Sequence, residues 1–201
     1  MSAITISRQM GSLGRDVARA VGERLGYRVV WRELINQAAR RAGQPELALA
    51  AIDELGLLGL APPTAAIESY TRAVAAVMEE LVAAGNVVIV GRAGQIILRG
   101  RPDVLHVRVV APLPIRIARI ADQQGVSLDA ARAQVEASDR SRRAYLKRFH
   151  HCDWDDPDLY DLIINTERID VSIAADMICA AVRAGAPAAT SSSAALGETA
   201  L

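Results

Sequence analysis

The residues best suited to chemistry lie at the start of the chain, in a glycine-bearing loop between two apolar segments. Residues 3–7 (AITIS) predict a short buried strand, and a helix with one apolar face is predicted to open at Asp16. Residues 8–15 form the loop between them. The N–H groups of such a loop and the dipole of the following helix both point at a bound anion, so the arrangement predicts a phosphate-binding site.

The loop departs from the standard P-loop pattern G-x-x-x-x-G-K-[ST]. Gln9 stands at the first glycine, Arg15 at the lysine and Asp16 at the hydroxyl residue. Arg15 can still bind phosphate through two parallel hydrogen bonds. A magnesium ligand is left open between Asp16 and Ser12, and an ordinary strand-to-helix turn is the alternative for the loop taken alone. The residues assigned to the donor phosphates are Gly11, Ser12, Leu13, Gly14, Arg15 and Asp16.

A second cationic site is predicted where the apolar segment 86–90 ends. This segment shows no polar alternation, as expected for a central strand of a parallel sheet, and Gly91 and Arg92 follow it directly. Ligands of open α/β sheets bind outside the carboxyl ends of the strands. We therefore expect Arg92 to hold an acceptor phosphate, together with Arg8; a surface arginine packed on a neighbouring loop is the alternative.

A third cationic site is predicted in the basic run 139–148 (DRSRRAYLKR). Phosphoryl transfer is accelerated mainly by positioned cations, and a mobile basic segment that closes over the phosphates would also exclude water. Arg140 and Arg142, with Arg15, are therefore the candidate catalytic residues. A solvated helix surface is the usual meaning of such a charge run. The acidic run 153–161 that follows is expected to set turns, cap ends and pair with the arginines.

Composition limits the class of protein. The chain has 201 residues, about half of them apolar, with 23 basic and 23 acidic side chains. A zero net charge argues against a globally basic nucleic-acid binder. No apolar run approaches the length of a membrane span, and we expect a cytoplasmic protein whose two cysteines, Cys152 and Cys179, are idle thiols. Its oligomeric state is left open.

The elements that must position these residues alternate between strands and helices. Further strands are expected at 27–31, 104–110 and 162–165, and helices at 33–42, 46–55, 64–84, 112–124, 128–138 and 171–184. This order predicts an α/β fold, a three-layer sandwich with a central parallel sheet of about five strands. We expect one domain over residues 1–184, with a helical acceptor-side insert at about 36–84 and a basic lid at about 138–157. Residues 185–201 are expected to form a disordered tail.

Taken in order, these motifs resemble the cytidylate kinase-like family of P-loop nucleoside monophosphate kinases. The opening ITISRQMGSLGR resembles that family's first strand and loop, and VIVGRAG resembles its "GRG/GRA" element. The patterns Asp139-x-x-Arg142-x-x-Tyr145 and Tyr160-Asp161-Leu162-x-x-Asn165-Thr166 resemble its lid and its last strand. The resemblance also makes an arginine in place of the P-loop lysine a trait of the branch.

The resemblance implies phosphoryl transfer from ATP to a nucleoside monophosphate, with Mg²⁺ as cofactor and CMP or dCMP as the expected acceptor. Gly11 to Gly14 with Arg15 would hold the donor phosphates, Arg92 would hold the acceptor phosphate, and Arg140 and Arg142 would neutralise the transferring group. Two other functions stay open. One is a kinase of another small metabolite, and the other is a nucleotide-binding regulator with weak catalysis.

Overall fold

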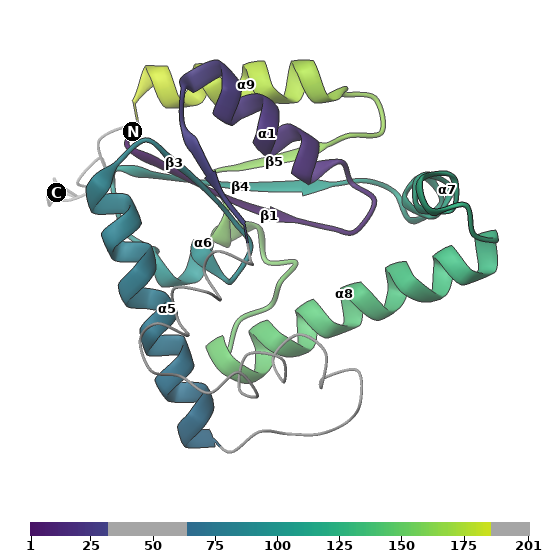
Figure 1. Ribbon diagram of the computed structural model, residues 1–201, viewed down its shortest axis with the longest axis horizontal. Helices are drawn as coiled ribbons and strands as arrows, with labels where there is room; N and C mark the ends of the chain where they lie inside the picture. The colour runs from purple at the N-terminus through teal and green to yellow at the C-terminus, as the bar shows by residue number, and fades with distance from the viewer. Residues whose placement is uncertain (32–63, 186–201) are drawn as a thin grey trace, which may run out of the picture.

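The computed structural model describes residues 1–31 and 64–185. Its five strands form one parallel sheet in the order β2-β3-β1-β4-β5, which confirms the predicted α/β sandwich (Figure 1). The strands are β1 (Ala3–Arg8), β2 (Arg28–Val30), β3 (Val87–Val90), β4 (Val104–Val110) and β5 (Leu162–Asn165). The helices are α1 (Gly14–Leu25), α5 (Thr64–Ala84), α6 (Gly94–Ile97), α7 (Leu113–Gln124), α8 (Leu128–His150) and α9 (Val171–Ala184), with a 3₁₀ turn η2 (Pro157–Leu159).

Helices cover both faces of the sheet, as the unbroken apolar strands require. On one face, α1 and α9 pack side by side over β1 and β4, with Ile4 and Val107 in the shared core (Figure 1). On the other face, Val74 and Met78 of α5 pack against Ile89 of β3. Because β1 lies between β3 and β4, the loop after β1 and the turn after β3 emerge at one edge of the sheet.

Helix α8 corrects the prediction of a helix that stops at residue 138. It begins where predicted, with Ser127 as its N-cap, whose Oγ accepts a hydrogen bond from the N–H of Ala130 at 3.2 Å. It then continues through the basic run to His150 and ends at His151, whose φ is 54°. The run contains neither glycine nor proline, and Glu136 lies near Arg132 and Arg140 one turn away on either side.

The remaining boundaries agree closely with the sequence. Helices α1, α5 and α7 end at Gly26, Gly85 and Gly125, as their glycines predict, and α9 covers the predicted residues. The expected helices at 33–42 and 46–55 and the tail from residue 186 lie outside the described residues. Within the described ranges, no helix combines the length and the apolar character needed to cross a bilayer.

Candidate active site

The loop after β1 is tied to β4 by the residue that replaces the first P-loop glycine. The N–H of Gln9 donates to the carbonyl of Val109 at 3.1 Å, and its side-chain Oε1 accepts from the N–H of Ala111 at 3.1 Å. Gly11 has a φ of 78° and Leu13 a φ of 59°, so the backbone turns twice before α1 begins. The first N–H groups of α1 have no partner within the helix and are available to an anion.

Side chains from other elements hold the loop's carbonyl groups. Arg116 Nη1 donates to the carbonyl of Met10, and Arg119 Nη1 donates to that of Gly11, both at 3.3 Å. Thr166 Oγ1 donates to the carbonyl of Ser12 at 2.9 Å. Since N–H and C=O of a trans peptide point in opposite directions, these contacts turn the following N–H groups toward the other side of the loop.

The residues predicted to bind phosphate and metal differ in their exposure to solvent. Arg15 and Asp16 are exposed on the first turn of α1, and Asp16 lies 3.7 Å from Arg19 in an exposed ion pair. Ser12 is fully buried, and its Oγ donates to the carbonyl of Gln9 at 2.9 Å. The Ser12 hydroxyl therefore serves the loop turn, whereas the Asp16 carboxylate faces solvent where a metal could approach it.

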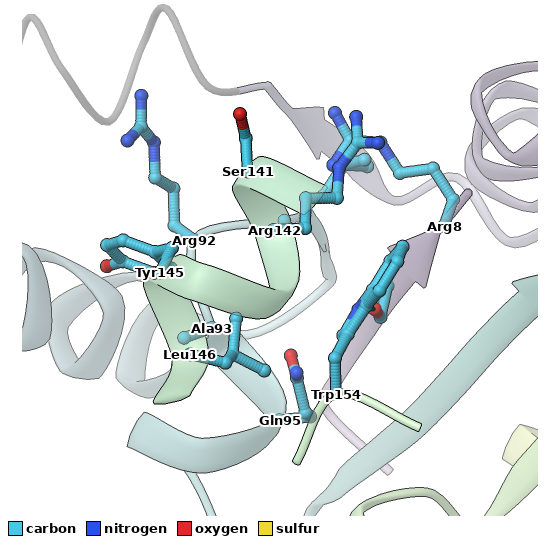
Figure 2. Close-up of a pocket in the computed structure, with 12 residues that line it drawn as sticks. Arg8, Arg92, Ala93, Gln95, Ser141, Arg142, Tyr145, Leu146 and Trp154 are labelled. Carbon is cyan, nitrogen blue, oxygen red and sulfur yellow. Dashed lines mark hydrogen bonds between the residues drawn. The ribbon is translucent and has the colours of Figure 1, made fainter. Parts of the chain in front are cut away.

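A pocket of about 110 Å³ lies between the ends of β1 and β3 and the middle of α8 (Figure 2). Arg8, Arg92 and Arg142 all line it, so the structure brings together three of the cations named from the sequence. Its lining is completed by Ser7, Val90, Gly91, Ala93, Gln95, Ser141, Tyr145, Leu146 and Trp154. Three positive charges from three separate elements around one small space make an anion the natural occupant.

Two glycines make room for the Arg8 side chain. A Cβ on Gly14 would stand 2.5 Å from Arg8 Cβ, and a Cβ on Gly91 would stand 2.8 Å from Arg8 Nη1. Arg8 therefore runs from the start of α1 to Gly91 in the turn after β3. One glycine of each motif, Gly14 and Gly91, therefore allows the close approach of this side chain.

The base of the pocket is a polar network that the sequence did not predict. Trp154 is 2% exposed, and its Nε1 donates to Ser7 Oγ at 3.0 Å. Tyr160 OH donates to the carbonyl of Trp154 at 3.0 Å, and the Arg108 guanidinium lies 4.6 Å from the Trp154 ring. Arg108 also forms an ion pair with Asp155. Sequence reasoning named the acidic run but had no means to find these partners, because Ser7 and Arg108 lie far from it along the chain.

Asp155 confirms that the acidic run pairs with arginines. Its carboxylate contacts Arg108 and, at 2.8 Å, Arg143 Nε. Burial alone would raise the pKa of Asp155, but the hydrogen bonds and charges of Arg143 and Arg108 outweigh it and hold that pKa below its ordinary value. Asp156 caps the following 3₁₀ turn by accepting from the N–H of Asp158 at 3.0 Å.

Arg140 lies away from the other predicted cations. Its side chain is 68% exposed and 3.8 Å from Glu136, and it does not line the pocket. Arg142 occupies the pocket side of the same helix, where its Nη1 donates to Ser138 Oγ. The catalytic role expected for Arg140 stays a prediction.

A second hollow adjoins the loop on the side of α7 and β5. It has a volume of about 440 Å³ and is lined by Leu13, Arg119 and residues 166–168 and 170–172. Arg119 is fixed there by donating from Nη2 to the carbonyl of Thr166 at 2.7 Å. Sequence reasoning missed this hollow, although Arg116 and Arg119, at i and i+3 on the helix after β4, were a signal that could have indicated it.

Residues 3–168 match the model of the cytidylate kinase-like family. A cytidylate kinase from Staphylothermus marinus is 28% identical over 172 residues, covering 85% of this chain and 90% of that protein. A cytidylate kinase from Pyrobaculum calidifontis is 28% identical over 184 residues, covering 89% and 94%.

Solved structures share the fold. An uncharacterized protein from Eubacterium ventriosum superposes with a TM-score of 0.72 at 21% identity, covering 91% of this chain and 99% of that one. Shikimate kinase from Acinetobacter baumannii, in complex with shikimate, superposes with a TM-score of 0.53 at 17% identity, covering 92% and 94%. The match over most of its length shows that this chain belongs to the cytidylate kinase-like family and is a phosphotransferase of the nucleoside monophosphate kinase type.

Proposed function

We propose that the protein transfers the γ-phosphoryl group of ATP to CMP or dCMP. The observation that carries this proposal is the convergence of Arg8, Arg92 and Arg142 on one pocket beside a phosphate-binding loop. The loop suits a donor triphosphate, and the pocket suits the monophosphate of an acceptor. The cytidylate kinases among the relatives support cytidine as the acceptor's nucleoside.

In this proposal the arginines divide the work. Arg15 and the N–H groups at the start of α1 hold the donor phosphates, and Arg8 and Arg92 hold the acceptor phosphate. Arg142 reaches the same pocket from α8, where it neutralises the charge that spreads over the transferring phosphoryl oxygens. The acceptor oxygen attacks the γ-phosphorus in line, and the bond to the β-phosphate oxygen breaks to release ADP.

Mg²⁺ is the expected cofactor. It commonly takes one or two carboxylates and binds the rest of its shell to water and substrate phosphates. Asp16 fits this need, because its carboxylate is exposed at the loop, whereas the buried Ser12 hydroxyl does not. When bound, the metal would neutralise charge on the donor phosphates.

The two hollows suggest how the substrates lie. The pocket lined by Arg8, Arg92 and Arg142, called the arginine pocket below, has a volume of about 110 Å³. This is below the roughly 300–1,000 Å³ typical of sites for whole small molecules, so the pocket suits only the phosphate end of the acceptor. The larger hollow at Leu13 and Arg119 adjoins the donor loop, so we assign it to the nucleoside part of ATP.

A panel of acceptors with ATP, followed by coupled detection of ADP, tests the proposal. CMP and dCMP are expected to be phosphorylated with the highest kcat/KM, ahead of UMP, AMP, GMP and dTMP. Preference for another monophosphate would remove cytidine from the proposal. Absence of turnover with every monophosphate, alongside turnover with an unphosphorylated metabolite such as a sugar or shikimate, would contradict it.

A further inference from the structure

A buried ion pair joins the first turn of α7 to the middle of α8. Arg116 Nη2 lies 2.9 Å from Asp139 Oδ2, and the two side chains are 5% and 7% exposed. We propose that this pair is a positioning device that holds α8, and with it Arg142, in a fixed place relative to the donor loop. The expected loss of kcat rests on the proposed function. The expected loosening of the loop and of α8 does not depend on it.

Arg116 supports the loop through both its side chain and its main chain. Its Nη1 donates to the carbonyl of Met10 at 3.3 Å, and its Nε donates to that of Ala111 at 3.0 Å. Its own carbonyl oxygen lies only 2.6 Å from where a Cβ on Gly11 would stand. One residue therefore contacts the loop, the end of β4 and, through Asp139, the helix that carries Arg142.

Asp139 is well placed to set the position of Arg142. The two residues are three apart on α8, so they lie on neighbouring turns of one side of the helix. Ser141 and Arg142 line the arginine pocket (Figure 2). A rotation or slide of α8 that broke the contact between Asp139 and Arg116 would displace the Arg142 guanidinium from the transferring phosphoryl group.

The contacts between α7 and α8 also include an apolar cluster. Ile117 and Ile120 of α7 pack against Ala131 and Val135 of α8, with the Met10 side chain against the same cluster. Apolar burial attracts the helices without a preferred direction, and the interdigitated side chains restrict their crossing angle. An ion pair with a 2.9 Å contact is directional, and it lies between the loop and the pocket.

The pair is not optimised for stability. A buried ion pair can often be replaced by apolar residues at little cost, whereas removal of one partner leaves a buried charge. Among the described residues, Asp139 Oδ1 is buried and has no hydrogen-bond partner. An imperfectly satisfied charged pair at the junction of two substrate-binding elements therefore fits a role in geometry.

A double variant removes the pair without leaving a charge buried. Arg116→Met/Asp139→Leu also loses the hydrogen bonds from Arg116 to the carbonyls of Met10 and Ala111, so Tm is expected to fall by about 4–8 °C. We expect kcat with ATP and CMP to fall at least tenfold, while the KM for CMP changes less than threefold, because Arg8 and Arg92 stand on β1 and after β3. A double variant with wild-type kcat would overturn the proposal.

Single variants and a control complete the design. Arg116→Met alone leaves the Asp139 carboxylate buried without its cation, so Tm is expected to fall by roughly 10 °C. Arg132→Gln removes an exposed contact, 3.9 Å from Glu136, on the same helix and should change neither Tm nor kcat. Asp139→Ala removes the acceptor of the ion pair but keeps the hydrogen bond of Arg116 to the loop, so it isolates the pair; the same tenfold loss of kcat is expected, and wild-type kcat again overturns the proposal.

Amide hydrogen exchange without nucleotide tests the pair independently of the reaction. In Asp139→Ala, which keeps the hydrogen bond of Arg116 to the carbonyl of Met10, we expect faster exchange at residues 10–14 and 138–146. If the variant exchanges faster but the wild-type protein phosphorylates no acceptor, the positioning role of the pair is supported and the proposed function is rejected. Unchanged exchange in both segments would overturn the positioning role whatever the activity.

Discussion

Gly11→Ala is the sharpest perturbation of the loop after β1, because two constraints meet at this residue. Its φ of 78° lies in the left-handed region that L side chains rarely adopt. A Cβ there would stand 2.6 Å from the carbonyl oxygen and 3.0 Å from the Cα of Arg116. Both are main-chain atoms of α7, so a change of rotamer cannot relieve the overlap and the loop must move.

The expected magnitude has two parts. The positive φ costs about 1 kcal/mol net of the entropy that alanine removes from the unfolded chain. Overpacking against Arg116 adds about 1–3 kcal/mol, for a total of about 2–4 kcal/mol. In a domain of this size that corresponds to a fall in Tm of roughly 4–16 °C. A displaced loop should also weaken ATP binding at least tenfold, which is about 1.4 kcal/mol.

Gly26→Ala is the matched control. Gly26 ends α1 with a φ of 66°, and among the described residues no atom beyond its immediate chain neighbours and the backbone of α1 lies within 4 Å of where a Cβ on it would stand. Gly26→Ala therefore carries only the cost of the positive φ, about 1 kcal/mol. Tm should fall by about 2–4 °C, and the Kd for ATP should not change. Thermal unfolding and calorimetric titration with ATP compare the two variants. Equal Tm and equal Kd for both would refute the reasoning.

Other variants test the remaining parts of the site. Arg15→Ala removes the cation at the lysine position, and its Kd for ATP should rise at least tenfold in a titration at constant ionic strength. Arg142→Ala should lower kcat roughly 10³-fold with KM changed less than threefold in steady-state kinetics; a wild-type kcat would exclude the role in charge neutralisation. Trp154→Phe loses the 3.0 Å hydrogen bond to Ser7, and unfolding should become easier by about 1–3 kcal/mol in urea titrations. Burial lowers the pKa of His106 below 6.5, so on acidification the His106 side chain of the unfolded chain takes up a proton before that of the folded protein does. The folded protein is therefore stabilised above pH 6.5, and this stabilisation is lost as the pH falls through the lowered pKa. The Tm of His106→Gln should fall less between about pH 7.5 and 5.5 than the Tm of the wild type does.

The fold was largely predictable because its signals are local. Unbroken apolar segments such as 87–90 marked buried parallel strands, and glycines marked the ends of helices. The grouping of Arg8 and Arg92 around one pocket was predictable for a related reason. Parallel strands carry the segments after their carboxyl ends to one edge of the sheet, so Arg8 and Arg92 had to come close.

What the sequence did not predict depends on contacts between distant segments. Trp154 and Ser7 are 147 residues apart, and no local pattern indicates that the indole would close the pocket beneath the arginines. Arg116 is an ordinary helix residue by its sequence, and only its burial against Asp139 distinguishes it. The end of α8 was misplaced because the change from apolar to charged residues at 139 suggested a new segment, although charged residues continue an exposed helix without cost.

A crystal structure with CMP and a non-hydrolysable ATP analogue tests most directly whether one loop and one arginine pocket hold the two phosphates of a single transfer. The donor phosphates are expected on the N–H groups of residues 11–16 beside Arg15. The phosphate of CMP is expected within hydrogen-bond distance of Arg8 and Arg92, with Arg142 facing the gap between the two substrates. A CMP phosphate bound away from this pocket, or donor phosphates bound away from the loop, would contradict it.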